Sequence, residues 1–395
     1  MNRIKKVLQW SKQHALALVI YVLGLILAAV IGRITTTALN RHDTGGLRFE
    51  PYIAVVVSKE SVDFPIPEEF LRGFQDGSSG KTYLETRDGR KVDVRTFEDL
   101  GSVEEARRIA NDLVHDQNCI LAIGNSNSTL TATTLDVFLG SSDPPSYILP
   151  IATANELITK AKTAGHGAVL RMVPDNAEQA DVIQRLIANL APTQRAAIYI
   201  DEENPVYSLN LSRDIASRVR RHGGRIVIEE MLGPSNSIYS SREAWKSEKP
   251  PDIIVFVGVA HHGLLLIDQL SELAVHTPLV FTDGCMVGAL IENIAKIPNR
   301  AFVLSPVGGK NEATQMPTYQ PIGRDAYTLT SQIISGCSNC TRTNLRSHIS
   351  QTKQQTMLSN GNAGEYSFNA DGNNIGMRYH VYEITGGKLK EVTQF

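Results

Sequence analysis

The sequence has little of several features that mark common protein classes. Aromatic residues make up only 6% of the 395-residue chain, which argues against a platform on which nucleic-acid bases stack. The formal net charge is −2, so no excess of positive charge favours a nucleic-acid partner. No internal repeat with a period of about 20 to 50 residues is visible, which argues against a solenoid.

The motifs of common enzymes are missing as well. The sequence has no H-E-x-x-H zinc motif, no P-loop and no G-x-S-x-G element, and no G-x-G-x-x-G follows its first predicted strand. His261 and His262 are adjacent, and in a strand they would point to opposite faces, so we expect that they cannot bind one metal ion together. We therefore expect no catalytic residues, no metal site and no cofactor, and a protein that is not an enzyme.

Cysteine is scarce, with four residues in the chain. Cys337 and Cys340 form a C-x-x-C motif, but no second pair and no H-x-x-x-H follows to complete a zinc site. A local disulfide in an oxidising compartment is the favoured interpretation, and a redox-active pair or two reduced thiols are the alternatives. Cys119 lies in an apolar run and is predicted to be a small core residue.

One long apolar run is present near the N-terminus. The chain is uncharged from Ala15 to Gly32, and this length of α-helix spans about 27 Å, close to the roughly 30 Å of a bilayer core. Lys and Arg residues in segment 1–14 predict that this end is cytoplasmic and that the bulk of the chain is periplasmic or extracellular. We predict a single-pass transmembrane anchor at 15–32 and a tether at 33–50. A cleaved signal and a buried core helix are the alternatives to the anchor.

From residue 51 onwards, short apolar runs alternate with amphipathic segments. Runs such as Tyr52–Val57, Cys119–Ile123 and Ile253–Val257 are typical of strands that are buried on both faces. Helical spacing separates such runs, which indicates parallel sheets with helical crossovers. The helices are predicted at 67–77, 102–115, 128–139, 176–190, 209–222, 263–274, 323–336 and 341–351. These units are too many for one small sheet, so we predict an α/β fold with two doubly wound parallel-sheet lobes.

Small polar residues follow two predicted strands in the first half of the chain. Ligands of open α/β sheets bind beyond the carboxyl ends of the strands. Gly124 and the Asn-Ser-Asn-Ser-Thr that follows it lead into a predicted helix, whose exposed amides suit a carboxylate. Ala152 and Thr153 follow the next strand along the chain. The alternative for both segments is that their hydroxyl groups only cap a helix.

Three segments at strand ends in the second half complete the candidate site. Tyr207, the pair Ala260 and His261, and Asp283 each follow a predicted strand. A carboxylate at Asp283, facing an anion site on the other lobe, would suit a zwitterion. The alternatives are that Asp283 is a turn residue and that Tyr207 only packs.

With these residues in place, the chain resembles the type I periplasmic binding proteins, and in particular the branched-chain amino-acid receptors used by ABC importers. The resemblance covers roughly residues 51–385. It rests on the order and spacing of several stretches, among them ILAIGNSNSTLTATTLDVF, YILPIATANEL, AAIYIDEENPVYSLNLSRDI, IIVFVGVAHHGLLLIDQL, LVFTDGCM and SFNADGNNIG.

The resemblance implies a role for each candidate on the first lobe. The loop at 125–129, with Asn127 and Ser128, is expected to hold the carboxylate of the ligand through side chains and backbone amides. The backbone at Ala152 and the hydroxyl group of Thr153 are expected to help hold the ligand.

The candidates on the second lobe have implied roles too. Tyr207 is expected to cover the ligand and Asp283 to meet its ammonium group. Ala260 and His261 stand where the family often has an aromatic residue.

The resemblance further implies three crossings between the lobes. Lobe 1 is then expected to comprise 51–173 and 308–362, and lobe 2 to comprise 174–307 and 363–395. We expect capture of a small zwitterion, an amino acid, by hinge closure for an ABC-type importer, with a membrane permease as the partner. The alternatives are a membrane-anchored sensory module that signals through a partner chain, and a module that only contacts proteins.

Overall fold

The computed structural model describes most of the chain beyond the predicted tether. The described residues are 50–58, 65–233, 238–294, 299–308 and 316–392. The predicted cytoplasmic segment, the predicted anchor at 15–32 and the tether up to residue 49 lie outside them. Within the described ranges, no helix combines the length and the apolar character needed to cross a membrane. The anchor and the tether therefore stay predictions.

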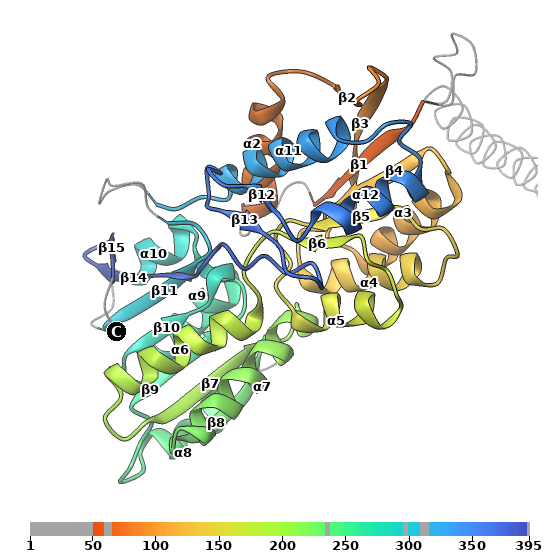
Figure 1. Ribbon diagram of the computed structural model, residues 1–395. Coiled ribbons are helices and arrows are strands. Elements are labelled where there is room, and N and C mark those ends of the chain that lie inside the picture. The colour runs from red at the N-terminus through yellow and green to blue at the C-terminus, as the bar shows by residue number, and fades with distance from the viewer. Residues whose placement is uncertain (1–49, 59–64, 234–237, 295–298, 309–315, 393–395) are drawn as a thin grey trace, which may run out of the picture. The chain divides into compact units, whose positions relative to one another are not determined.

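The first sheet has six strands in the order β2-β3-β1-β4-β5-β6 (Figure 1). Its strands are β1 (Tyr52–Val57), β2 (Tyr83–Glu85), β3 (Lys91–Glu98), β4 (Cys119–Ile123), β5 (Ser146–Leu149) and β6 (Val169–Arg171). The helices between them are α2 (Ile66–Ser78), α3 (Val103–His115), α4 (Ser128–Leu139) and α5 (Asn155–Thr163). Every residue of β1 and β4 is buried, as the continuous apolar runs predict.

The second sheet has seven strands in the order β15-β14-β11-β10-β9-β7-β8. Its strands are β7 (Arg195–Asp201), β8 (Arg225–Leu232), β9 (Ile253–Val257), β10 (Leu279–Phe281), β11 (Ala301–Ser305), β14 (His380–Thr385) and β15 (Lys388–Glu391). The helices of this lobe are α6 (Asn176–Leu190), α7 (Pro205–Arg221), α8 (Arg242–Trp245), α9 (Ala260–Glu272) and α10 (Gly288–Ile294). Short 3₁₀ turns lie at Ile238–Ser241 and Asp283–Cys285.

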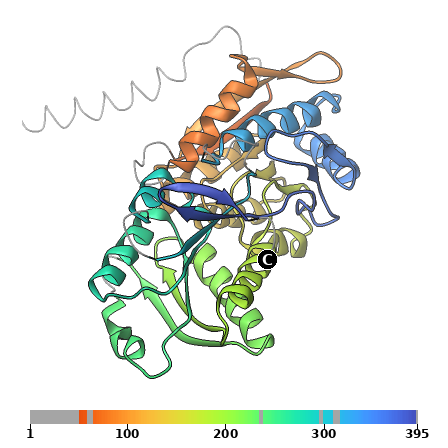
Figure 2. The same ribbon diagram turned by 90° about the vertical axis from the view of Figure 1, so that its left-hand side faces the viewer.

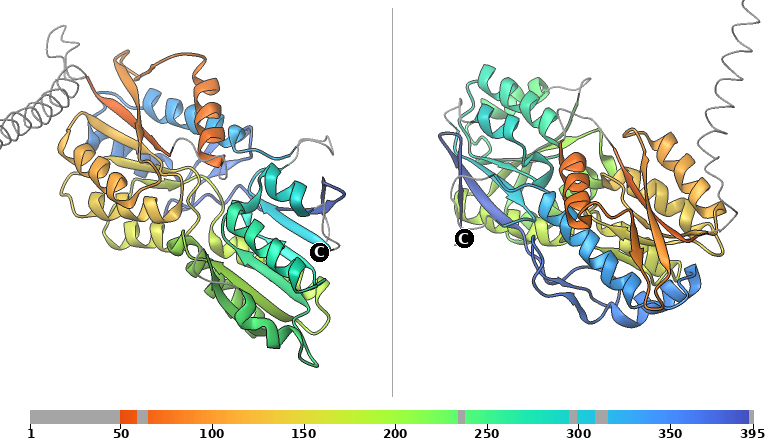
Figure 3. Two further views of the ribbon diagram at one scale, coloured as in Figure 1. Left: turned by 180° about the vertical axis from the view of Figure 1, so that it is seen from behind. Right: turned by 90° about the horizontal axis from the view of Figure 1, so that it is seen from above.

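The C-terminal part of the chain returns to the first lobe before it ends in the second sheet (Figure 3). Its elements are α11 (Gln320–Ser335), α12 (Arg342–Thr352), β12 (Thr356–Leu358) and β13 (Tyr366–Ser367), followed by β14 and β15. Helix α11 packs against α2, as Figure 2 shows (α2 orange, α11 blue). Glycine permits the close approach, because a Cβ atom on Gly73 would lie 2.0 Å from the carbonyl oxygen of Gln320.

Alternate residues of β1 enter two different hydrophobic clusters. Ile53 and Val55 pack in the cluster that contains side chains of α2, α11 and α12. Ala54 and Val56 pack in the cluster formed with α3, α4 and α5. Because successive side chains of a strand point to opposite faces, helices cover both faces of the first sheet. The strand ends are then the places where polar groups can be reached from solvent.

The predicted α/β fold with two lobes is confirmed, but the sheets are mixed rather than wholly parallel. Strand β2 pairs antiparallel with β3, and β14 pairs antiparallel with β11 and β15. Strand β2 has only three residues, too few for a strand to be predicted from its alternation. The residue boundaries predicted for the two lobes stay predictions.

The C-x-x-C motif lies between α11 and α12. Cys337 and Cys340 form a disulfide, with their Cα atoms 5.7 Å apart. The guanidinium group of Arg342 then docks α12 on the first lobe, because it donates to the backbone carbonyls of Leu113 and Cys119 at 2.6 and 2.8 Å. Cys119 itself is fully buried in β4, as predicted.

Candidate functional site

Five of the predicted ligand-binding residues line one small pocket, which we call the inner pocket. Its volume is about 30 Å³, which is room for a few water molecules at most. The predicted residues in its lining are Asn127, Ser128, Thr153, Tyr207 and Asp283. The structure thus brings together side chains that follow strands of both sheets, as strand-end sites require.

A glycine and an asparagine shape the first-lobe wall of the inner pocket. Gly124 has a φ of +142°, and a Cβ atom there would lie 2.2 Å from the carbonyl oxygen of Val56, so only glycine fits. Asn127 is the N-cap of α4, and its Oδ1 accepts a hydrogen bond from the backbone N–H of Leu130 at 2.9 Å. Its side-chain oxygen is therefore committed to capping the helix, whereas the sequence-based alternative for this loop assigned capping to hydroxyl groups.

The first turn of α4 keeps one backbone donor for an anion. The N–H of Thr129 donates to Oδ1 of Asn204, a residue of the second lobe, at 3.2 Å. The Oγ of Ser128 accepts from the N–H of Ala154 at 3.3 Å. The N–H of Ser128 has no hydrogen-bond partner among the described residues. Because a helix N-terminus attracts negative charge, this amide and the hydroxyl group beside it suit a carboxylate.

On the second-lobe wall, the carboxylate of Asp283 is held by two tyrosines. Oδ1 accepts a hydrogen bond from the hydroxyl group of Tyr207 at 2.7 Å, and Oδ2 accepts one from Tyr379 at 3.1 Å. Burial raises the pKa of Asp283, and hydrogen bonds from Gln179, Tyr207 and Tyr379 oppose this shift. Such a carboxylate gains from a cationic group that enters the pocket.

Two tyrosines of the inner pocket region were not predicted from the sequence. Tyr379 lies just before β14, and Tyr319, which lines the pocket, lies just before α11. Tyr319 lies in the part of the sequence between β11 and α11, and Tyr379 in the part between β13 and β14. The expectation that ligands bind beyond the carboxyl ends of strands could not identify these tyrosines, because neither residue directly follows a strand that ends at the site.

Two other predicted residues lie beside the pocket rather than in its lining. Ala152 and Ala260 are each 1% exposed, and neither is among the residues that line the inner pocket. Tyr207 lies in the first turn of α7 rather than in a loop, because the helix begins at Pro205, four residues before the predicted start. Proline favours the first position of a helix, where its missing N–H has no cost.

A larger cavity of about 210 Å³ adjoins the inner pocket, and we call it the outer cavity. It is lined by Ser58, Pro67, Glu68, Gly101, Ser126, Asn127, Glu203, Asn204, Val259 and His261. Ser126, Asn127, Asn204 and Val259 line both spaces. His261, the remaining predicted residue, therefore belongs to the site through the outer cavity, whose lining includes two carboxylates.

Known proteins share this arrangement of strands and helices. No family model matches the chain. A leucine-binding protein from Thermotoga maritima superposes with a TM-score of 0.72 at 17% identity, over 87% of this chain and 98% of that protein. The branched-chain amino-acid transporter substrate-binding protein from Streptococcus pneumoniae, solved with isoleucine, gives a TM-score of 0.68 at 17% identity, over 87% and 99% of the two chains. This chain has the type I periplasmic binding protein fold.

A sequence relative agrees with this fold. A Leu/Ile/Val-binding protein from Rhizobium johnstonii is 24% identical over 196 residues. The matched segment spans 50% of this chain and 51% of that protein. The resemblance inferred from the sequence motifs is therefore confirmed.

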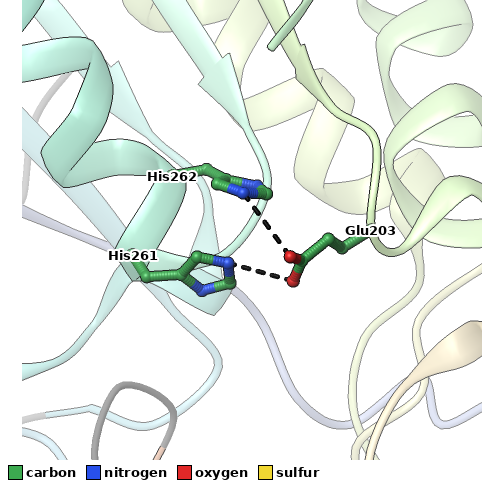
Figure 4. A group of neighbouring side chains, drawn as sticks. All are labelled: Glu203, His261 and His262. Carbon is green, nitrogen blue, oxygen red and sulfur yellow. Dashed lines mark ion pairs between the residues drawn. The ribbon is translucent and has the colours of Figure 1, made fainter. Parts of the chain in front are cut away.

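The expectation that His261 and His262 point to opposite faces is wrong. Helix α9 begins at Ala260, three residues before its predicted start, so both histidines lie in the first helical turn rather than in a strand. Adjacent residues of a helix are about 100° apart instead of 180°. The two rings have centroids 4.1 Å apart, and both face the carboxylate of Glu203 (Figure 4).

Both histidines contact acidic side chains of the same lobe. His261 Nε2 lies 2.9 Å from one carboxylate oxygen of Glu203, and His262 Nε2 lies 3.6 Å from the other. His262 Nδ1 lies 2.9 Å from Oδ1 of Asp201, whose side chain is fully buried. Burial lowers the pKa of His262, but the hydrogen bond to Asp201 and the nearby carboxylates outweigh it, so the net pKa is raised.

Proposed function

We propose that this protein is an extracytoplasmic binding protein that captures a small amino acid between its lobes for an ABC-type importer. One observation carries the proposal: a free amide at the N-terminus of α4 and the buried carboxylate of Asp283 line the same pocket. The relatives support it, since their names describe leucine-, isoleucine- or valine-binding proteins. Relatives of this kind are binding proteins rather than enzymes.

The inner pocket offers complementary groups to the two charges of an amino acid. We place the carboxylate of the ligand at Ser128, where the helix N-terminus supplies positive potential. Its ammonium group would then meet Asp283, whose carboxylate is already oriented by Tyr207 and Tyr379. Preorganisation of this kind lowers the entropic cost of binding. A neutral acid or a simple amine would satisfy only one of the two sites.

The outer cavity indicates which side chain the ligand carries. The inner pocket is too small for more than the main-chain groups of an amino acid, so a side chain would extend past Asn127 into the outer cavity. Glu68, Glu203 and His261 line that space. A branched aliphatic side chain would displace the water that hydrates these polar groups and could not replace its hydrogen bonds. The lost hydration would reduce the free energy of binding. We therefore propose a small or polar amino acid.

The partner and the location belong to the same proposal. We propose that closure of the two lobes retains the ligand, that a membrane permease receives it, and that the segment at 15–32 anchors the chain with its bulk outside the cytoplasm. Protease added to intact cells or spheroplasts should degrade the chain beyond residue 50 and spare segment 1–14. Full protection of the whole chain would refute export.

The direct test is isothermal titration of the purified full chain with the twenty amino acids. We expect saturable binding of at least one small or polar amino acid, and loss of that binding in Asp283→Asn. The matched control is Asp268→Asn, because Asp268 is an exposed acid of α9 away from both cavities. No heat with any amino acid, or equal binding by both variants, would refute the proposal.

A further inference from the structure

A second constellation of side chains lies at the edge of the outer cavity, in the second lobe alone. Glu203 comes from the loop between β7 and α7, and His261 and His262 come from the first turn of α9. One ligand atom of each residue lies within 4.8 Å of the others. The constellation combines two imidazole rings and a carboxylate, the donor set of many zinc sites.

The spacing of the donor atoms suits a metal ion. Two ligands of a tetrahedral zinc ion, each about 2.0–2.1 Å from the metal, lie about 3.3 Å apart. The distances from the two histidine Nε2 atoms to Glu203, 2.9 Å from His261 to Oε2 and 3.6 Å from His262 to Oε1, are each close to this value. We propose that Glu203, His261 and His262 form a binding site for one divalent transition-metal ion such as Zn²⁺.

The choice of a transition metal follows from the donors. Imidazole nitrogen suits zinc and its neighbours, whereas calcium and magnesium take oxygen ligands. Three protein ligands leave at least one coordination position open. Because Glu203 and His261 line the outer cavity, the site borders a space of about 210 Å³. A bound water molecule or an oxygen atom of a ligand in the cavity would complete the coordination.

Asp201 provides the supporting contact that such sites need. It ends β7, and its fully buried carboxylate accepts hydrogen bonds from the backbone N–H groups of Glu203 at 2.8 Å and Val259 at 2.9 Å. The same carboxylate lies 2.9 Å from His262 Nδ1. A hydrogen bond there holds the ring with Nε2 turned toward Glu203, as metal-bound histidines are commonly held by a second carboxylate.

Metal can reach the site from solvent. The side chain of Glu203 is 52% exposed and that of His261 is 31% exposed, whereas His262 is 4% exposed and fixed. One rigid ligand and two accessible ones would let the site form without any change in the lobes. The proposal therefore does not depend on amino-acid capture.

The test uses the full chain freed of metal and titrated with Zn²⁺ in competition with a chromophoric chelator. We expect one Zn²⁺ per chain and a loss of affinity of at least tenfold in His261→Ala, His262→Ala and Glu203→Gln. Asp201→Asn should weaken binding by about 10- to 100-fold, because it removes only the supporting charge. His276→Ala is the matched control, since His276 is an exposed histidine shortly after α9.

A spectroscopic measurement separates metal binding from general destabilisation. Co²⁺ added in place of Zn²⁺ should give visible absorption bands in the wild type and in His276→Ala, and none in His261→Ala. Glu203→Gln changes a half-exposed side chain and should keep its circular dichroism spectrum, so its loss of binding cannot be ascribed to unfolding. Absence of competition for Zn²⁺ by the wild type, or equal affinity in Glu203→Gln and the wild type, would overturn the site. Amino-acid titration in the presence of EDTA tests the proposed function separately.

Discussion

The inner pocket and the outer cavity share four lining residues, yet they differ in how their polar groups are used. In the inner pocket, most side-chain groups are already paired within the protein, as Asn127 is with Leu130 and Asp283 is with Tyr207 and Tyr379. In the outer cavity, Glu68 pairs with Arg72 and Glu203 with His261, but more than half of each glutamate side chain is exposed to solvent. We therefore propose that the inner pocket fixes the two charges of one ligand and that the outer cavity selects what is attached to them.

The largest difference between the inner pocket and the outer cavity is expected in amino-acid affinity when Asp283 is substituted. Asp283→Asn removes the partner of the ligand ammonium and should lower amino-acid affinity at least thirtyfold, since loss of one member of a buried charge pair costs about 2–5 kcal/mol. Glu203→Gln should instead change the order of preference among amino acids and leave the tightest affinity within about threefold. Isothermal titration of both variants checks this. Equal losses would show that the two spaces are not distinct in function.

A smaller loss of affinity is expected when the orientation of Asp283 is disturbed. Tyr207→Phe removes the hydroxyl donor 2.7 Å from Oδ1 and keeps the ring. We expect about a tenfold loss, because a hydrogen bond to a charged group contributes roughly 1.5–3 kcal/mol. Tyr199→Phe is the control, since its hydroxyl group contacts Ser241 and neither residue lines the inner pocket or the outer cavity. An unchanged affinity in Tyr207→Phe would contradict the assigned role.

The N-cap of α4 is expected to affect both stability and binding. Asn127→Ala removes the cap of this helix and should lower the free energy of unfolding by about 1 kcal/mol. Thr341→Ala removes the corresponding cap of α12, where Thr341 accepts from the N–H of Asn344 at 3.3 Å and lines neither cavity. Urea denaturation should give similar losses for both, whereas only Asn127→Ala should weaken amino-acid binding. Weaker binding in Thr341→Ala would show an indirect effect.

The smallest effect that we expect is on the pH dependence of stability. Burial raises the pKa of Asp283, so the folded protein holds the proton more tightly than the unfolded chain. The ionised carboxylate therefore opposes folding as pH rises through its folded pKa. Asp283→Asn should have a modestly higher Tm than the wild type at pH 7, and the difference should shrink toward about pH 4. Thermal denaturation from pH 4 to 8 would contradict this if the wild type were more stable throughout.

Most of the fold could be predicted because apolar runs and helical spacing are strong local signals. Strands β1, β4 and β9 match their predicted runs at Tyr52–Val57, Cys119–Ile123 and Ile253–Val257. Strand β11 was not predicted, although all five of its residues are buried. It pairs with β10, the preceding strand, and with β14, which lies much later in the chain. No local pattern in a short apolar run specifies such pairing.

The candidate site was predictable where a residue directly follows a strand, and much less so elsewhere. Thr153 and Asp283 obeyed that rule and line the inner pocket. Tyr379 did not, because it precedes β14, and its contact with Asp283 depends on the pairing of β14 with β11, a strand far away in the sequence. The cluster at Glu203 was missed through an error of three residues in the start of α9, since that shift decides whether two adjacent histidines diverge or converge.

The most direct test of the account is a crystal structure of the full chain with its tightest-binding amino acid. The account predicts that the ligand carboxylate accepts a hydrogen bond from the N–H of Ser128, that its ammonium group contacts Asp283, and that its side chain extends into the outer cavity. A ligand bound outside the interlobe pockets, or one whose ammonium group lies away from Asp283, would contradict it.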